Sequence, residues 1–352
     1  MKTYLVTGGA GFIGSNFIHY LLEECGNDVR VINLDALTYA GNPDNLKDIE
    51  KDPRYSFVQA DLADREAVFN IIKANPIDYV VHFAAESHVD NSIKDPAVFI
   101  RTNVLGTNNL LDAVKEAWET EAAKTKRFLY VSTDEVYGML PDDGVSFFTE
   151  ETPFNPSSPY AASKAAADML VMAYHKTYGF PALVTNCSNN YGPNQFPEKF
   201  IPLIITNALK GKKIPLYGSG TNIRDWLFVK DHCRGIHMAL LNGKCGERYN
   251  IGGHNEKRNI EIIKIIIKTL RELLPENDER RSKITEELIE YVPDRKGHDV
   301  RYAINPDKIK KELGWEVETH FEEGIKKTVE WYINNAEWCE RVLDGSYREK
   351  ST

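Results

Sequence analysis

The chain has 352 residues, of which 42% are hydrophobic, enough for one large core or two smaller ones. Its 43 basic and 52 acidic residues give a net charge of -9, which argues against general affinity for nucleic acid or an anionic membrane. The five cysteines are scattered without a CxxC pair, and no apolar run approaches the ~20 residues of a membrane span. We therefore expect a cytoplasmic protein that binds neither nucleic acid nor membranes.

Apolar runs of strand length alternate with amphipathic segments of helix length in the first half of the chain. The predicted strands are residues 4–7, 29–34, 56–60, 79–83, 128–132 and 182–186. This alternation is typical of a parallel sheet covered by helices on both faces. We therefore expect a Rossmann-type, doubly wound α/β domain at residues 1–187.

The alternation loosens after about residue 187, where glycine and proline become frequent in NNYGPNQFPEKFIP and YGSGTNIRDW. We expect a smaller mixed α/β domain for substrate binding at residues 188–340, with residues 225–242 returning to the first domain. A charged helix is predicted from residue 259 to about 274, followed by an exposed charged segment at 276–283.

The motif TGGAGFIG places Gly8, Gly11 and Gly14 between the first predicted strand and a helix. Glycines at this spacing allow a tight turn, a close approach of a pyrophosphate to backbone N–H groups, and close packing of the helix. Asp35 lies 21 residues after Gly14, where a carboxylate can bind the adenosine ribose and repel the extra phosphate of NADP. An ordinary strand-to-helix turn is the alternative, but this context favours NAD binding.

The motif YAASK places Tyr160 and Lys164 four residues apart on a predicted helix, so both side chains lie on one face. The ammonium group could stabilise a phenolate and let the tyrosine act as a base near neutral pH. About one such spacing is expected by chance in this chain. A catalytic role for the pair is supported because it lies about 150 residues after a dinucleotide motif.

The motif STDEVYG places Asp134 and Glu135 directly after the apolar run at residues 128–131. A parallel sheet would present them at its carboxyl edge. In an arbitrary sequence, two such acids are more often helix-capping residues in a solvated turn. A catalytic acid and base is the other interpretation.

The motifs TGGAGFIG, YAASK, FAAESHVD and VSTDEVYG together resemble those of the extended short-chain dehydrogenase/reductase superfamily. Longer segments, among them TNVLGTNNLLDA, CSNNYGPNQFPEKFIPLII, IPLYGSGTNIRDWLFVKDH and VPDRKGHDVRYAI, are similar to the dTDP-glucose 4,6-dehydratase family over most of residues 1–305. Three positions depart from the family pattern: Asn91 and Asn186 stand where arginine is common, and Lys296 stands where proline is common.

The resemblance implies a chemical role for both carboxyl groups. Tyr160, helped by Lys164, would take the proton of the sugar 4-hydroxyl while hydride passes from carbon 4 to NAD. Glu135 would then remove the proton on carbon 5, Asp134 would protonate the departing 6-hydroxyl, and hydride would return to carbon 6. Thr133 would position the 4-hydroxyl. We therefore expect dTDP-glucose to be the substrate.

The resemblance also implies binding residues in the matched segments. Those for NAD are Gly8, Gly11, Phe12, Ile13, Gly14, Asp35, Thr38, Asp61, Leu62, Ala84, Ala85, Ser87, Thr102, Tyr160, Lys164 and Asn190. Those for the nucleotide sugar are Ser87, Thr133, Asn189, Lys199, Pro215, Tyr217, Arg224, Asn259, Arg295 and His298. An isolated Arg, Lys or Asn is usually a solvated surface residue, so only the motif context supports these assignments.

No metal is expected, because His88 and His298 lie in no recognised ligand spacing. The segments 97–118 and 160–178 resemble the helices of the family's intersubunit four-helix bundle, which implies a homodimer, although their apolar faces could equally be core.

Two other functions compete with the dehydratase. A nucleotide-sugar 4-epimerase or decarboxylase would share the oxidation at carbon 4 but would not need Asp134 and Glu135 as an acid and base. A non-catalytic NAD-binding protein would not need these two residues together with Tyr160 and Lys164.

Overall fold

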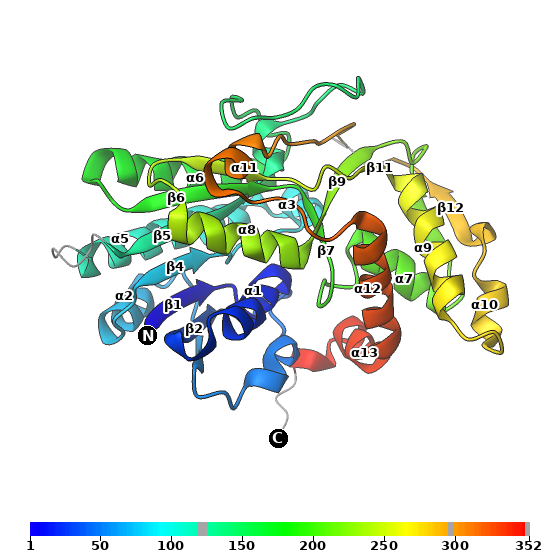
Figure 1. Cartoon of the computed structure of the whole chain (residues 1–352), viewed down its shortest axis with the longest axis horizontal. Helices are drawn as coiled ribbons and strands as arrows, with labels where there is room; N and C mark the ends of the chain where they lie inside the picture. Colours follow the sequence, from blue (N-terminus) through cyan, green and yellow to red (C-terminus); the bar gives the residue numbers. More distant parts are fainter. Residues whose placement is uncertain (119–124, 295–298, 349–352) are drawn as a thin grey trace.

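A seven-stranded parallel sheet forms the centre of the protein, shown in Figure 1. The computed structural model describes residues 1–118, 125–294 and 299–348. The strand order is β10-β6-β5-β4-β1-β2-β3. The strands are β1 (Lys2–Thr7), β2 (Val29–Asp35), β3 (Tyr55–Gln59), β4 (Tyr79–His82), β5 (Arg127–Thr133), β6 (Ala182–Cys187) and β10 (Arg248–Ile251).

Helices cover both faces of this sheet, so its strands are buried on both sides. Along β1, Tyr4 and Val6 belong to one core and Leu5 to the other, as the alternation of side chains requires. The first core is covered by α1 (Phe12–Glu24) and α8 (Val229–Asn242). The second is covered by α2 (Arg65–Ala74), α5 (Thr107–Ala117) and α6 (Pro159–Tyr178). The expected doubly wound α/β class is confirmed.

Short helices complete the first half of the chain. They are the 3-10 helices η1 (Gly26–Asp28), η2 (Pro43–Ile49) and η5 (Asp134–Tyr137), the α-helices α3 (Val89–Lys94) and α4 (Pro96–Phe99), and the π-helix η3 (Ile100–Gly106).

A second group of elements packs around its own core, at the right in Figure 1. Its sheets are β11-β9-β7 and β12-β8, which combine parallel and antiparallel pairs. The strands are β7 (Asn189–Tyr191), β8 (Ile214–Tyr217), β9 (Ile223–Phe228), β11 (Glu256–Arg258) and β12 (Ile289–Val292). The helices are α7 (Phe200–Leu209), α9 (Asn259–Leu273), α10 (Glu279–Lys283), η6 (Glu286–Leu288) and α12 (Phe321–Asn334).

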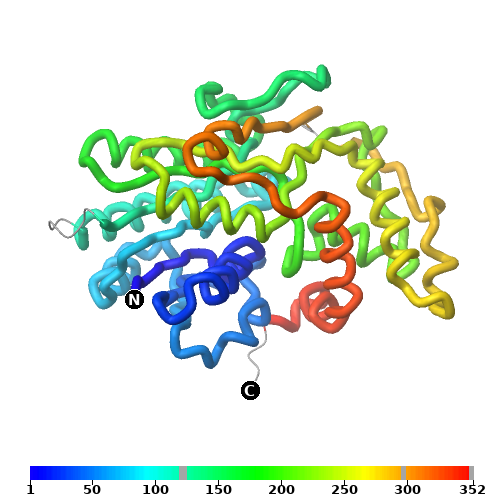
Figure 2. Tube along the Cα trace, viewed as in Figure 1, coloured from blue at the N-terminus to red at the C-terminus, as the bar shows by residue number. Residues whose placement is uncertain are grey.

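Three late segments lie against the first half of the chain. Strand β10 pairs with β6, and α11 (Asp307–Leu313) packs on β10 and α8. Figure 2 shows that α13 (Ala336–Asp344) and η7 (Ser346–Arg348), in red, lie close to the blue N-terminal part.

The predicted strands correspond to β1–β6 within two residues, whereas β10 was not predicted. The division into domains at residue 187 stays a prediction.

Two general features of the chain follow from the described residues. Within them, no helix combines the length and the apolar character that crossing a membrane demands. All five cysteines are free thiols.

Three histidines are buried in this fold and held in the neutral form. Burial lowers the pKa of His82 and His232 to about 3, and that of His237 to about 4, from the ordinary 6.5. Neither ring nitrogen of His232 has a hydrogen-bond partner among the described residues. Between pH 6.5 and these lower values the unfolded chain binds more protons than the folded one, so acid favours unfolding.

We expect the free energy of unfolding to fall as the pH is lowered from 6.5 towards 4. Each histidine contributes up to about 1.4 kcal/mol per pH unit, and other groups add to this. His232→Leu should reduce the slope of the unfolding free energy against pH by the contribution of one proton, about 1.4 kcal/mol per pH unit. The exposed His320→Gln is the matched control and should leave the slope unchanged. Urea unfolding at several pH values measures it, and a slope in His232→Leu equal to that of the parent would contradict the assignment.

Candidate active site

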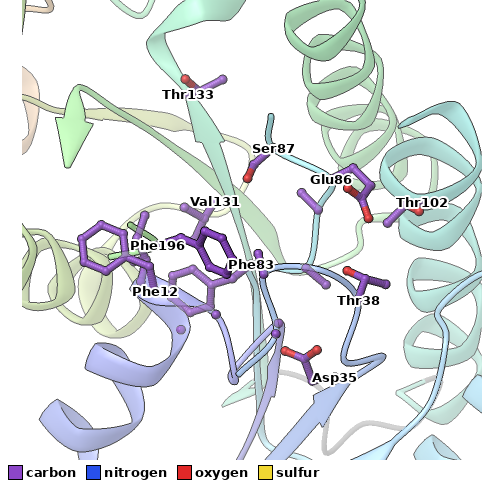
Figure 3. A pocket seen from close by; sticks show the side chains of 18 of the residues that line it. Phe12, Asp35, Thr38, Phe83, Glu86, Ser87, Thr102, Val131, Thr133 and Phe196 are labelled. Carbon is purple, nitrogen blue, oxygen red and sulfur yellow. The ribbon is translucent and has the colours of Figure 1, made fainter. Parts of the chain in front are cut away.

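A cavity of about 440 Å³ opens at the carboxyl edge of the large sheet. Residues at or just after the ends of five strands line it: Gly8 after β1, Asp35 in β2, Ala84 after β4, Thr133 in β5 and Ser188 after β6. In Figure 3, Asp35 and Thr133 lie at opposite ends of the view, and Ser87 and Val131 lie between them. Ligands of open α/β sheets bind at this edge.

The glycine turn leaves room for a ligand at the start of α1. Gly8 has a φ of +71°, and a Cβ there would lie 2.6 Å from the nitrogen of Ala84. A Cβ on Gly14 would lie 2.2 Å from the oxygen of Gly8, so larger residues would displace the turn. Gly11 is the N-cap residue, and no side chain caps the helix. The backbone N–H groups of this turn therefore fit a diphosphate.

Asp35 is tied to the same turn. Its two carboxylate oxygens accept hydrogen bonds from the backbone nitrogens of Ala10 (2.9 Å) and Leu37 (2.8 Å). Burial raises the pKa of Asp35, and these two bonds oppose the shift. Thr38 lies on the same side of the cavity in Figure 3. Each carboxylate oxygen keeps a further lone pair, so the predicted ribose contact fits this position.

Tyr160 and Lys164 enter the cavity from α6. Ser158 caps this helix by accepting a hydrogen bond from the nitrogen of Ala161 (3.1 Å). The Lys164 Nζ donates to the oxygen of Val131 (2.7 Å), and burial lowers its pKa to about 7. Burial, with a smaller effect of the Glu135 charge, raises the pKa of Tyr160 well above 10. Burial thus opposes the phenolate among these residues alone, and the role of Tyr160 as a base near neutral pH stays a prediction.

Asp134 and Glu135 occupy different environments at the end of β5. Thr133 caps η5 through a hydrogen bond from the Glu135 nitrogen to its Oγ1 (3.3 Å). Asp134 is only 2% exposed, and burial followed by the Glu135 charge raises its pKa well above the ordinary value. Glu135 is half-buried. A buried carboxyl group with a raised pKa beside a more exposed one is the arrangement that an acid and a base require.

Several buried polar atoms lining the cavity have no hydrogen-bond partner among the described residues. They include Ser132 Oγ, Asp134 Oδ2, Asn189 Oδ1, Asn190 Oδ1 and Gln195 Oε1. Buried polar groups are nearly always paired in folded proteins. This cavity therefore fits a ligand with many hydroxyl or amide groups.

The structure brings most of the predicted site residues together. All five predicted catalytic residues and all the residues predicted for NAD line the cavity, as do Ser87, Asn189 and Lys199 of the substrate set. Four others of that set lie outside its lining: Pro215 and Tyr217 in β8, Arg224 in β9 and Asn259 at the start of α9. Arg295 and His298 lie outside the described residues. The roles of all these residues stay predictions.

Arg224 is mostly buried beside the catalytic residues. Its guanidinium lies 4.3 Å from the centre of the Tyr302 ring and donates to the oxygens of Ile223 (2.7 Å) and Asp299 (3.0 Å). Its charge opposes the upward shift of the Asp134 pKa. Arg224 therefore influences the acid electrostatically although it does not line the cavity.

Sequence reasoning missed other lining residues, among them Glu86, Phe196 and Trp338. Glu86 lies within the quoted motif FAAESHVD, and burial raises the pKa of its carboxyl. Phe196 lies in the segment NNYGPNQFPEKFIP. No motif marked Trp338, which reaches the cavity from the C-terminal helix α13. Among the described residues, no group of three or more His, Cys, Asp and Glu could hold a metal ion.

The glycine turn, the Tyr–Lys pair on α6 and the doubly wound sheet define a protein of the extended short-chain dehydrogenase/reductase class. The family model described as GDP-mannose 4,6 dehydratase matches residues 5–328. A dTDP-glucose 4,6-dehydratase of Xanthomonas campestris pv. campestris is 53% identical over 99% of this chain and 98% of the relative. The chain therefore belongs to the nucleotide-sugar 4,6-dehydratase family, together with the dTDP-glucose 4,6-dehydratases.

Two solved structures have similar folds. The dTDP-glucose 4,6-dehydratase of Bacillus anthracis, crystallised with NAD, has a TM-score of 0.85 and 49% identity over 97% of this chain and 100% of its own. The UDP-glucose 4-epimerase of Thermotoga maritima, crystallised with UDP-glucose, has a TM-score of 0.82 and 29% identity over 95% of this chain and 99% of its own. The fold alone therefore does not separate a dehydratase from an epimerase.

Asp35→Ala should weaken NAD binding by about 10- to 100-fold, because hydrogen bonds to a charged group are lost. It should also reduce discrimination against NADP, since a negative charge disappears. Asp35→Asn removes the charge but turns its amide nitrogen towards one of the two backbone N–H groups, so it tests the selectivity and not the affinity alone. Titration of each variant with both dinucleotides measures this, and unchanged affinity and selectivity would place the ribose elsewhere.

Proposed function

We propose that this protein is an NAD-dependent dTDP-glucose 4,6-dehydratase, a hydro-lyase that forms dTDP-4-keto-6-deoxyglucose and water. The observation that carries the proposal is the pair of unlike carboxyl groups, Asp134 and Glu135, in one cavity with Tyr160 and Lys164. The full-length similarity to dTDP-glucose 4,6-dehydratases supports the same substrate.

An NAD-dependent 4-epimerase or decarboxylase is the alternative. It would share the oxidation of carbon 4 and the Tyr–Lys pair. It would have no use for a buried protonated acid beside a second carboxyl group, because no water is eliminated across carbons 5 and 6. The environment of Asp134 therefore favours the dehydratase.

The cavity fits the cofactor at the glycine turn and along the strand ends. Bound NAD would accept hydride from carbon 4 of the sugar and return it to carbon 6. Burial and the Glu135 charge disfavour the Tyr160 phenolate, so positive charge supplied by the oxidised cofactor would be needed to stabilise it. Lys164 is fixed by its bond to Val131, so its ammonium keeps one position beside the ligand.

Tyr160 takes the proton of the 4-hydroxyl, and Thr133 orients this hydroxyl. The ketone formed at carbon 4 acidifies the proton on carbon 5, which Glu135 removes as base. Asp134 delivers its proton to the departing 6-hydroxyl, and the burial that raises its pKa keeps this proton in place until then. Each residue thus handles one proton of the cycle.

The nucleoside diphosphate is proposed to extend from the cavity towards β8 and α9. Pro215 and Tyr217 would contact the base, and Arg224, Asn259, Arg295 and His298 would surround the diphosphate and nucleoside. Tyr217 is 40% exposed, so its ring is accessible to a ligand.

Incubation with dTDP-glucose should give the 4-keto-6-deoxy product without net formation of NADH, because oxidation and reduction occur in one cycle. Product analysis by NMR, with absorbance at the reduced-nicotinamide band, measures both. Stoichiometric NADH or an epimerised sugar would overturn the proposal.

Glu135→Gln should lower product formation by about 10²- to 10⁴-fold, the effect typical of losing a general base. Oxidation at carbon 4 should survive, so enzyme-bound reduced nicotinamide should accumulate in a single turnover. Asp134→Asn should keep exchange of the carbon 5 proton with deuterated water while water loss fails. Tyr160→Phe should show neither signal. Rapid carbon 5 exchange in Glu135→Gln would show that another group is the base.

We also propose a homodimer formed by η3, α5 and α6. Large apolar side chains are exposed on α6 and on the neighbouring helices α3 and η3: Ile93, Ile100, Leu105 and Met169. Isolated exposed apolar residues are common, but a group of them on adjacent helices is typical of an interface.

The double variant Ile100→Glu, Met169→Glu should be monomeric, because an interface would bury two charges without partners. Leu241→Glu, on α8 at the opposite face of the sheet, is the matched control and should stay dimeric. Sedimentation velocity measures both, and a monomeric parent would refute the dimer.

We propose a cytoplasmic location, supported by five free thiols and a nicotinamide cofactor. Fractionation of the source cells would test it, and recovery from an oxidising compartment would contradict it.

A further inference from the structure

The C-terminal segment α13–η7 lies against the cofactor half of the cavity, although it is distant in sequence. In Figures 1 and 2 this red segment is close to the blue part of the chain that contains η2. The family match ends at residue 328, whereas α13 begins at residue 336. The segment was not among the residues predicted to bind a ligand.

Asn45 joins three separate parts of the chain. Its Nδ2 donates to the oxygen of Ala10 in the glycine turn (3.0 Å). Its Oδ1 accepts from Trp338 Nε1 in α13 (3.0 Å) and from Asn194 Nδ2 (3.1 Å). Asn45 is 4% exposed, and Asn45, Asn194 and Trp338 all line the cavity. One buried amide therefore holds α13 beside the turn where a diphosphate is expected.

Further contacts fasten the segment to Asp44 in η2 and to Tyr39 in the loop after β2. An ion pair joins Arg341 to Asp44, with 2.9 Å between Nε and Oδ2. The Tyr347 hydroxyl donates to the oxygen of Tyr39, and its ring packs on Phe196, which in turn packs on Tyr39. Phe196 also lines the cavity. These contacts hold the segment beside the lining residue Phe196.

The inner end of α13 is anchored to the second group of elements. The Trp338 ring lies 4.9 Å from that of Trp331 and 6.3 Å from that of Tyr332, both in α12. The Tyr332 hydroxyl donates to the oxygen of Gln195, another lining residue. Trp338 is therefore held on both sides, by α12 and by Asn45, and presents a fixed surface to the cavity.

We propose that residues 336–348 form the outer wall of the dinucleotide site and retain NAD between catalytic cycles, with Trp338 as the wall residue that faces the cofactor. This rests on the proposed function, in which the cofactor is regenerated in every turnover and has no reason to leave. A ligand covered by the sheet on one side and by this wall on the other can leave only when the wall opens. Trp338 and Arg341 thus control the rate of dissociation and take no part in the chemistry.

The test compares the dissociation of NAD from the purified, cofactor-loaded full chain and its variants. Trp338→Ala should release NAD at least about tenfold faster, the effect typical of truncating a buried aromatic anchor at an interface. Its activity should fall after gel filtration and return to the parent kcat when excess NAD is added. Trp338→Phe, which keeps an aromatic ring, should retain NAD better than Trp338→Ala. Leu343→Ala, on the same helix and 50% exposed, is the matched control.

A second pair of variants tests the wall should Trp338→Ala fail to fold. Arg341→Glu should speed NAD release, and the exchange Asp44→Arg, Arg341→Glu should restore retention because the ion pair is rebuilt with reversed charges. The proposal would be overturned if Trp338→Ala released NAD at the parent rate. If that variant did not fold, release at the parent rate from Arg341→Glu would overturn it. If added NAD did not restore activity, the segment would have a structural role and would not act by retaining NAD. A parent chain that binds no NAD would instead refute the proposed function.

Discussion

The parallel register of the central strands is the constraint on which the rest of the structure depends. Thr7 of β1 lies beside His82 of β4, His82 beside Tyr130 of β5, and Thr133 of β5 beside Cys187 of β6. All these strands therefore end at the same edge, and the loops after them meet in one cavity. A slip of one residue would turn every side chain of a strand to the other face. Because both faces are filled by separate cores, the register is strongly fixed.

Burial acts on Asp134, Tyr160 and Lys164 in the same direction, towards their neutral forms. It raises the pKa of Asp134 and Tyr160 and lowers that of Lys164 to about 7. For Asp134 this is useful, because an acid must keep its proton until the leaving group departs. For Tyr160 it is a cost, since a base must lose its proton. In the proposed cycle, burial thus favours the protonated acid that elimination needs, whereas the phenolate that oxidation needs would have to be stabilised by positive charge from the oxidised cofactor. This difference follows from desolvation and does not require a special geometry.

The sequence was sufficient for the features that are local. Strands β1–β6, the turn at Gly8 to Gly14 and the position of Asp134 after a buried strand all follow from short patterns. Strand β10 was missed because RYNI contains the polar residues Arg248 and Asn250 in place of a continuous apolar run, and because its pairing with β6 is non-local. Trp338 was missed for the same reason, since its partner Asn45 is 293 residues away. The upward shift of the Tyr160 pKa was missed because a motif shows the neighbouring lysine but not the amount of solvent excluded.

Strand β10 also bears on Asn186, a position at which the motif resemblance implies arginine. The Asn186 Nδ2 donates to the oxygen of Thr133 (3.1 Å), so this amide supports the backbone at the start of the catalytic turn. Asp168, one helical turn after Lys164, has a side chain with no exposure, and a buried carboxylate requires a cation. That cation is Arg248 of β10, 2.7 Å away. An uncharged residue is therefore tolerated at 186, because the neighbouring strand provides the charge that balances Asp168.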